Sequence, residues 1–105
     1  MKYLKIKKQE DFQKIFSKGK RLFSHNLTIL YTPSKYTRMG ISVGKKHGKA
    51  VQRNRLKRLL REAFRLSTDS LKGTYSFILF PKPKNEYSFL EFKKSIKQMF
   101  EKGNL

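Results

Sequence analysis

The sequence predicts an α+β protein, a small two-layer sandwich of helices and one sheet. Its 105 residues supply one modest hydrophobic core, so we expect a single domain over residues 1–105. Apolar residues alternate along 26–32 and 38–43, which is typical of strands. Segment 50–66 lacks proline and glycine and places its apolar residues at helical spacing. The expected order is helix, two strands with one further short strand, helix, strand, helix.

The first part of the chain contains a basic lead-in and a short helix. We expect residues 1–8 to be loosely held. Residues 9–17 are predicted to form a helix, with Glu10 and Asp11 in the first turn, where carboxylates suit the helix dipole. Gly19 then ends the helix. Its apolar face consists of Phe12, Ile15 and Phe16.

Strands are expected in the middle of the chain and after the long helix. A short turn-like link joins 26–32 to 38–43, which predicts that these two strands pair antiparallel. A short strand over 21–23 precedes them. The segment 74–80 is the most apolar, so we expect it at the centre of the sheet, and Pro81 ends it. Alternation along the first strand places three side chains on one side: Leu27, Ile29 and Tyr31.

Two longer helices complete the predicted fold. Ser88 and Glu91 fit a capping box that starts the last helix, which runs to about Lys102. Its inward residues are Phe89, Phe92, Ile96, Met99 and Phe100. In the helix over 50–66, the apolar positions are Leu56, Leu59, Leu60, Ala63 and Phe64.

The helix over 50–66 carries dense positive charge opposite its apolar side. Like charges at i, i+4 spacing destabilise a helix by about 0.2–0.5 kcal/mol per pair, and solvated helices usually mix in acids. Here Glu62 is the only acid. A polyanionic partner would remove the repulsion, so we expect this face to bind one. The cations at i, i+4 spacing are Arg53, Lys57, Arg61 and Arg65, with Asn54, Arg55 and Arg58 within or beside the band.

The composition points to the same kind of partner. Lys plus Arg number 26 and Asp plus Glu 7, giving a formal net charge of +19, which favours an anionic partner such as nucleic acid or a lipid surface. No apolar run approaches the roughly 20 residues of a membrane span, and the N-terminus lacks the apolar region of a secretory signal. The absence of cysteine excludes disulfides and thiolate metal sites. We therefore expect a soluble cytoplasmic protein without a membrane partner.

Catalysis by the protein itself is weakly supported. Several of its seven carboxylates fall at predicted helix N-termini, where capping explains them, and none shows the repeated acidic spacing of a metal-dependent nuclease. His25 and His47 lie far apart in predicted loops without a Cys or H-x-x-x-H partner, so we expect no zinc site. We therefore predict no catalytic residue, no metal ligand and no cofactor held by dedicated protein ligands.

The loop over 44–50 superficially resembles a phosphate-binding P-loop. Its spacing is one residue short, and Ala50 stands where the motif has Ser or Thr, so a nucleotide triphosphatase is excluded. Its glycines still allow the backbone to approach phosphates closely. The loop lysines that would accompany them are Lys45, Lys46 and Lys49.

The aromatic residues permit two interpretations. Phe12, Phe16 and Tyr31 could pack in the core, or they could form a platform on which unpaired bases stack beside cations; the residues alone leave both open. A helix-turn-helix needs a second helix joined by a tight turn, whereas a strand and a loop precede the basic helix here. The RRM aromatic signature is also absent. A small domain that binds a phosphate backbone, RNA rather than DNA, is the prediction from these residues.

Two motifs resemble one family. Residues 40–61 read GISVGKKHGKAVQRNRLKRLLR, and residues 11–19 read DFQKIFSKG, with LYT at 30–32. This pattern resembles the protein component of bacterial ribonuclease P over most of the chain, and the segment around Arg53 is highly specific.

The resemblance implies a function. Ribonuclease P removes the 5′ leader from precursor tRNA by hydrolysing one phosphodiester bond, and its RNA subunit performs this chemistry with Mg2+. The protein would be an accessory subunit, inactive alone, one per RNA, that binds the leader and the catalytic RNA and broadens substrate specificity. The alternative from the residues is a non-catalytic RNA-binding module such as a ribosomal protein, which shares the charge.

The resemblance also implies site residues and a handedness. The strands 38–43 and 74–80 with the helix 50–66 would form a left-handed β-α-β crossover, as in the second domain of ribosomal protein S5, although general rules favour a right-handed one. The residues implied to contact the catalytic RNA are Lys45, Lys46, Arg53, Asn54, Arg55, Lys57, Arg58 and Arg61. Those implied to form the leader-binding cleft are Phe12, Phe16, Tyr31, Arg53 and Lys57.

Overall fold

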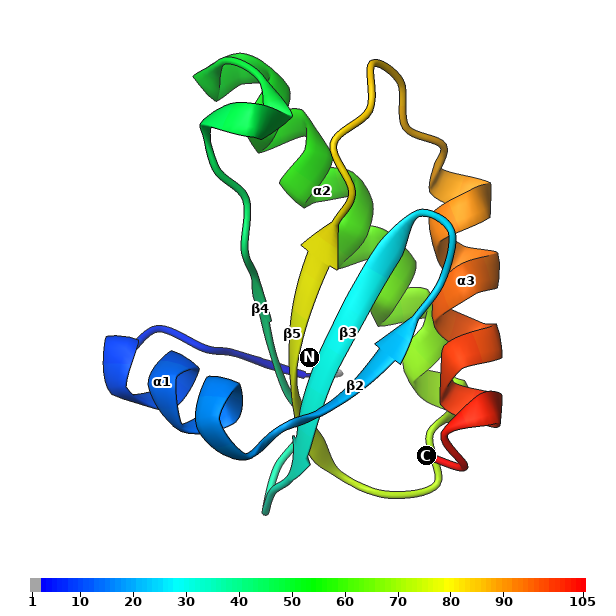
Figure 1. The fold of residues 1–105 in the computed structure, drawn as a ribbon. Helices are drawn as coiled ribbons and strands as arrows, with labels where there is room; N and C mark the ends of the chain where they lie inside the picture. Colours follow the sequence, from blue (N-terminus) through cyan, green and yellow to red (C-terminus); the bar gives the residue numbers. More distant parts are fainter. Residues whose placement is uncertain (1–2) are drawn as a thin grey trace.

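Five strands form one sheet in the order β1-β4-β5-β3-β2 (Figure 1). The computed structural model describes residues 3–105. β1 (Leu4–Lys5), β4 (Arg38–Ile41) and β5 (Tyr75–Pro81) run parallel, whereas β3 (Leu27–Pro33) pairs antiparallel with β5, and β2 (Lys20–Phe23) antiparallel with β3. β5 is central, as its apolar sequence predicted.

The predicted pairing of β3 with β4 is wrong. The two strands run in opposite directions, but β5 lies between them and pairs with both. The reason is burial, because β5 places Phe77 and Leu79 in one core cluster and Ile78 in another, on the two faces of the sheet. A strand that is apolar on both faces is stabilised most at the centre of the sheet. The ladder extends one residue past β4, where Ser42 donates its N–H to the carbonyl of Leu79 at 2.9 Å.

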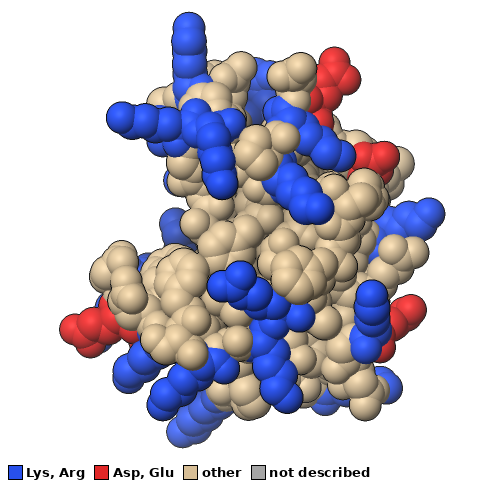
Figure 2. Space-filling model, in the orientation of Figure 1, with Lys and Arg blue, Asp and Glu red and all other residues tan. Residues whose placement is uncertain are grey.

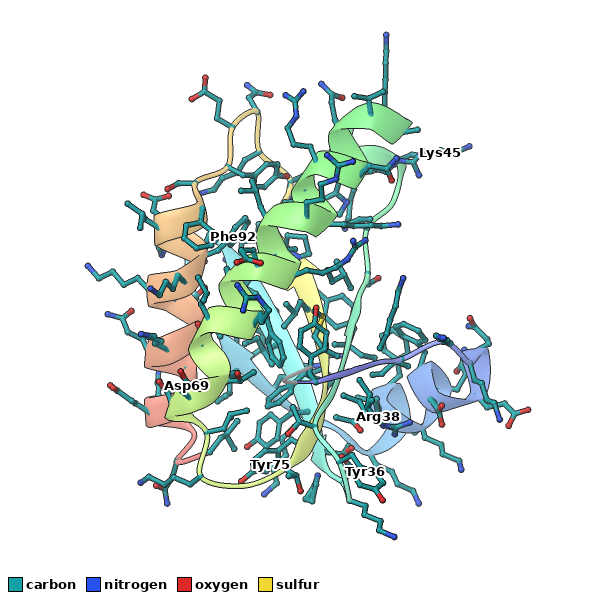
Figure 3. The ribbon with its side chains drawn as sticks, turned by 180° about the vertical axis from the view of Figure 1, so that it is seen from behind. Tyr36, Arg38, Lys45, Asp69, Tyr75 and Phe92 are labelled. Carbon is teal, nitrogen blue, oxygen red and sulfur yellow. The ribbon has the colours of Figure 1, made fainter. Side chains whose placement is uncertain are left out.

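Helices cover both faces unequally. α2 (Ala50–Ser67) and α3 (Phe89–Lys102) pack over one face and enclose the larger core cluster (Figures 1 and 3). α1 (Gln9–Lys18) lies against part of the opposite face, where Ile15 joins a smaller cluster. Two short 3-10 helices, η1 (Lys45–His47) and η2 (Thr68–Ser70), flank α2. The α+β class and the three helices are as predicted.

The crossover from β4 through α2 to β5 is left-handed. In Figure 1 both strands point upward, α2 lies behind the sheet, and β5 lies to the right of β4; the view from behind in Figure 3 agrees. The start of α3 also follows its sequence signal, since the hydroxyl oxygen of Ser88 accepts the Glu91 N–H at 3.3 Å.

The N-terminal segment corrects a prediction. Residues 1–8 were expected to be loose, and residues 1–2 lie outside the described part of the chain, but Leu4–Lys5 form β1 and Ile6 is only 4% exposed. The ring of Tyr3 packs edge-on against Phe64 of α2, with centroids 5.2 Å apart. The segment therefore pairs with the free edge of β4 and contributes to both faces of the sheet.

Candidate nucleic-acid interface

The basic loop before α2 is tethered to the end of β5. The buried imidazole of His47 accepts the Gly44 N–H on Nδ1 at 3.0 Å, so its Nε2 carries the proton and donates to the carbonyl of Pro81 at 2.7 Å. Gly48 then adopts φ 104°, and a Cβ there would lie 2.2 Å from Oε1 of Gln52. Lys45 and Lys46 remain exposed on this anchored loop.

The start of α2 is held by a side chain of its own first turn. The Lys49 N–H donates to Oε1 of Gln52 at 2.7 Å, which satisfies one free donor at the helix N-terminus. From there the cations of α2 separate into two sets. Arg53, Lys57 and Arg61 are half-buried and follow one another at i, i+4 spacing, and we call them the inner stripe. The outer set is exposed and comprises the cations Arg55, Arg58 and Arg65, with the neutral Asn54 beside them.

Positive charge covers this part of the surface, as it covers much of the same face of the molecule (Figure 2). Figure 2 shows Lys and Arg side chains gathered over the upper end of the molecule, where η1 and the start of α2 lie. Glu62, the only acid of α2, accepts hydrogen bonds from Arg65, and this pairing lowers the pKa of the Glu62 carboxyl. Because Glu62 is paired with Arg65, the inner stripe keeps its charge for another partner.

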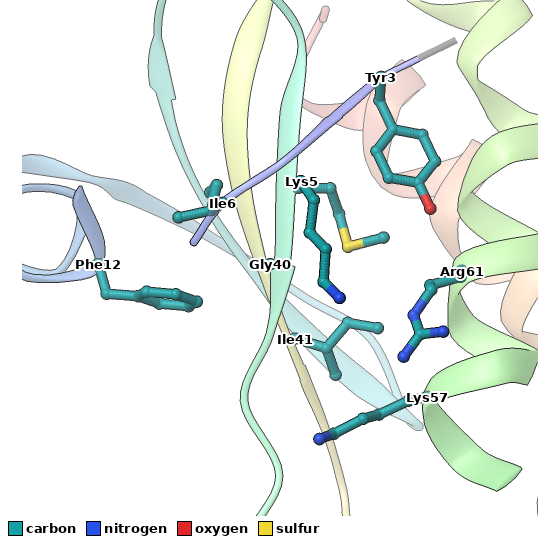
Figure 4. A pocket seen from close by; sticks show the side chains of 9 residues that line it. Tyr3, Lys5, Ile6, Phe12, Gly40, Ile41, Lys57 and Arg61 are labelled. Atoms are coloured by element: carbon teal, nitrogen blue, oxygen red, sulfur yellow. The ribbon is translucent and has the colours of Figure 1, made fainter. Parts of the chain in front are cut away.

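A hollow of about 230 Å³ lies where the inner stripe meets the edge of the sheet. Figure 4 shows Phe12 on one side of β4, and Tyr3, Lys57 and Arg61 on the other. Lys5 of β1 also lines it, so three cations surround an apolar floor that includes Ile41. Burial raises the pKa of the Tyr3 phenol, although nearby Arg61 opposes that rise, so the phenol is neutral at physiological pH.

Close packing fixes the α1 side of this hollow. The ring of Phe12 approaches Gly40 so closely that a Cβ on Gly40 would lie 2.7 Å from its Cζ atom. Arg38, two residues earlier in β4, holds the start of α1 through an ion pair with Asp11 at 3.2 Å and donates to the Ser76 hydroxyl at 2.9 Å. Glycine at position 40 therefore allows α1 to lie against the sheet.

The structure does not bring the three predicted cleft aromatics together. Phe12 and Phe16 lie on the α1 face of the sheet, where the Phe16 ring is 39% exposed and 5.6 Å from that of Phe80. Tyr31 lies on the other face and packs against Tyr75 at 5.8 Å and Phe77 at 6.4 Å. Tyr31 is partly buried against the main core, on the face opposite Phe12 and Phe16, and its place in the leader-binding cleft stays a prediction.

The predicted cleft cations are also separated. Lys57 lines the hollow together with Arg61, whereas Arg53 lies one turn before Lys57 and is not among the lining residues. The Nε atom of Arg53 is buried without a hydrogen-bond partner in the described part of the chain. An unpaired buried donor costs about 1–3 kcal/mol, so a movement of this side chain toward a ligand oxygen would recover free energy.

Several residues of this surface were not predicted. Tyr3, Lys5 and Ile6 were missed because the lead-in was expected to be loose, although its alternation of aromatic, apolar and basic residues is a weak strand signal. Phe80 was predicted to lie in the central strand and Phe23 in a short strand, and neither was predicted to be part of a binding surface. Residues 3–105 contain no cluster of three or more His, Cys, Asp or Glu side chains arranged to hold a metal ion. None of the helices in the described part of the chain is both long and apolar enough to cross a membrane.

A basic helix, an anchored lysine loop and an exposed ring of α1 beside the sheet are typical of a small α+β domain of the RNA-binding class. The family model for ribonuclease P matches residues 1–104. Relatives named ribonuclease P protein component include one from Clostridium kluyveri, 39% identical and covering 100% of this chain and 98% of the relative. Another, from Bacillus velezensis, is 41% identical over 96% of this chain and 90% of the relative.

Solved structures agree with the sequence comparisons. The ribonuclease P protein from Thermotoga maritima superimposes with a TM-score of 0.83 at 28% identity, covering 93% of this chain and 96% of that one. The Staphylococcus aureus protein gives 0.81 at 30% identity, covering 97% and 96%. The chain belongs to the ribonuclease P protein family, whose members are subunits of the holoenzyme that cleaves precursor tRNA. The predicted function as a ribonuclease P subunit is confirmed, and the alternative of a ribosomal protein is not favoured.

Proposed function

We propose that this chain is the accessory subunit that binds the unpaired 5′ leader of precursor tRNA, while the RNA subunit hydrolyses the phosphodiester bond with Mg2+. The observation that carries the proposal is the junction of two features. Exposed Phe16 lies against Phe80 on the open sheet face, and the hollow with Lys57 and Arg61 lies at the edge of the same sheet. Rings and cations within one path suit a single strand, whose bases stack while its phosphates meet positive charge.

The acidic residues support an accessory role, because several of them already have structural partners. Asp11 is paired with Arg38 and Glu62 with Arg65. Glu91 lies in the first turn of α3, where a carboxylate suits the helix dipole. The paired carboxylates of Asp11 and Glu62 stabilise the fold, and the RNA subunit is proposed to supply the groups that hold Mg2+ in the holoenzyme.

The cations are proposed to divide between two RNAs. Lys57 and Arg61 of the inner stripe line the hollow. We assign these two cations, with Arg53 one turn before Lys57, to the leader and the adjacent backbone. Exposed residues of η1 and α2 that do not line the hollow are assigned to the RNA subunit: Lys45, Lys46, Arg55 and Arg58, together with Asn54. One protein per RNA and a cytoplasmic location remain predictions.

Reconstitution tests the proposal directly. The purified protein alone should leave precursor tRNA intact, and adding it to the RNA subunit at low Mg2+ should restore cleavage. The assembled particle should bind precursor tRNA more tightly than mature tRNA, because only the precursor carries a leader. Cleavage by the RNA-free protein would contradict the accessory role, and equal affinity for the two tRNAs would contradict leader binding.

A further inference from the structure

The face of the sheet that carries α1 is only partly covered. Cross-strand partners share a face, and the register places Arg21, Leu30, Ile78 and Gly40 in one line across β2, β3, β5 and β4. α1 covers this line over β3, β5 and β4, since Ile15 packs with Leu30 and Ile78, and Phe12 lies over Gly40. Arg21 at its β2 end is exposed. The neighbouring line meets α1 at Phe80, which packs against the smaller core cluster and contacts Phe16.

That neighbouring line carries aromatic residues, and we call it the open row. The register pairs Phe23 with Thr28 and Thr28 with Phe80, so Phe23, Thr28 and Phe80 lie side by side on β2, β3 and β5. Phe80 contacts Phe16 of α1 at its other side, with ring centroids 5.6 Å apart. A continuous track therefore runs across the strands, in the spatial order Phe16, Phe80, Thr28, Phe23.

The exposure of Phe23 is unusual for its residue type. Of the nine phenylalanines, all within the described residues, only Phe16 at 39% and Phe23 at 63% are exposed. Both lie on this one face, at the two sides of Phe80. A single exposed ring needs no explanation, but two rings that flank a third on one open sheet face form a patch.

The charged residues around the open row indicate which kind of ligand would bind there. Arg21 is exposed on the same face, two residues before Phe23. On the other side, the Lys82 N–H donates to the carbonyl of Asn26 at 3.0 Å, which continues the β3–β5 ladder and places Lys82 on the Phe80 face. None of the seven carboxylates lies in β2, β3 or β5. Rings flanked by cations, without acids, suit unpaired RNA better than an apolar peptide.

We infer that the open row is a second stacking station for single-stranded RNA, on which the leader continues from Phe16 and Phe80 to Phe23. The first station is the pair of rings Phe16 and Phe80. Phe23 lies two strands from Phe80, roughly 10 Å away at the usual strand spacing, so it meets a base that the first station does not reach. The inference rests on the proposed function, because the RNA that arrives at Phe23 is the leader bound at Phe16. It predicts that the protein senses leader length through one exposed ring.

Precursor tRNAs whose leaders are lengthened one nucleotide at a time test this inference in the reconstituted holoenzyme. With the natural chain, affinity should rise in two steps as each station is filled. Phe23→Ser should leave affinity for short leaders unchanged and remove the second step, a loss of about fivefold or more for long leaders. Phe23→Tyr should restore it, because the tyrosine ring also stacks. Tyr36→Ser is the matched control, since Tyr36 is 57% exposed and lies at the other end of the sheet (Figure 3).

The possible results distinguish a failure of the stacking station at Phe23 from a failure of leader binding as a whole. If Phe23→Ser binds every leader as the natural chain does, or weakens assembly with the RNA subunit by the same factor for all substrates, the stacking station at Phe23 is wrong. If the holoenzyme with the natural chain binds precursor tRNA no more tightly with any leader than without one, the proposed function itself is wrong. Because Phe23 is mostly exposed, thermal unfolding of Phe23→Ser should match that of the natural chain, and a fall in its melting temperature above that of Tyr36→Ser would indicate a packing role instead.

Discussion

His47 and Pro81 are joined by a hydrogen bond of 2.7 Å between Nε2 and the carbonyl oxygen, which ties the loop before α2 to the end of β5. The same ring accepts the Gly44 N–H on Nδ1. Both ring nitrogens are therefore in use, and only the neutral imidazole can serve both partners. A buried histidine therefore holds the loop that carries the exposed lysines of η1.

Replacing His47 should loosen the basic loop. His47→Ala leaves a buried carbonyl and an N–H without partners, so we expect the free energy of unfolding to fall by about 1–3 kcal/mol. Affinity for the RNA subunit should fall as well, because Lys45 and Lys46 lose their positions. Chemical denaturation and equilibrium binding measure the two effects. His25→Ala provides the control, since His25 is exposed in the β2–β3 hairpin, and a similar loss in both variants would contradict the role of the tether.

Gly40 is required by the approach of Phe12 rather than by its own backbone angles. Gly40→Ala places a Cβ 2.7 Å from Cζ of Phe12 and 3.4 Å from Cβ of Ile6, so α1 must shift. We expect a loss of about 1–3 kcal/mol in the free energy of unfolding and weaker leader binding. Gly44→Ala is the matched control, because nothing lies within 4 Å of a Cβ there. Equal stability of the two variants would show that the α1 contact tolerates displacement.

Part of this arrangement follows from sequence and part depends on tertiary contacts. Alternation correctly put Tyr31 on one side of its strand with Leu27 and Ile29. It could not tell which side α1 would cover, because strand periodicity has no information about the partner of each face. The resemblance placed Tyr31 with Phe12 and Phe16, and the structure separates them. The insertion of β5 between β3 and β4 was missed for a similar reason, since pairing depends on contacts distant in sequence.

Lys57 should contribute to RNA binding through charge. It lines the hollow with Arg61, and each phosphate of a single strand that is neutralised adds about 0.7 to the slope of log affinity against log salt. Lys57→Ala should therefore weaken binding of leader-containing precursor and reduce that slope by about this amount. Lys94→Ala on the exposed side of α3 serves for comparison. An unchanged slope for Lys57→Ala would exclude a direct phosphate contact.

The partly buried phenol of Tyr3 should make stability depend on pH in the alkaline range. Burial raises its pKa above the usual value of 10.0, with Arg61 opposing. Above pH 10 the unfolded chain loses this proton while the folded chain retains it, so the free energy of unfolding decreases with rising pH until the folded pKa is passed. Tyr3→Phe cannot titrate and should show a smaller decrease. Denaturation of both proteins across this range measures the difference, and parallel curves would contradict it.

Phe16 and Tyr31 provide the sharpest contrast between binding and packing. Phe16 is partly exposed beside Phe80, so Phe16→Ala should cost about 1–3 kcal/mol of leader binding with a small effect on unfolding. Tyr31 packs against Tyr75 and Phe77 in the main core, so Tyr31→Ala should cost about 3 kcal/mol of stability.

Tyr31→Phe tests whether Tyr31 contacts the leader or only packs in the fold, since this change keeps the ring contacts and removes only the hydroxyl. We expect it to retain both stability and leader affinity, because the ring of Tyr31 lies on the face that α2 and α3 cover. Leader affinity measured at a temperature where each variant is fully folded keeps the two effects apart. If folded Tyr31→Phe lost leader affinity as Phe16→Ala is expected to, the leader would have to reach the α2 face of the sheet, and the path across the α1 face would be wrong.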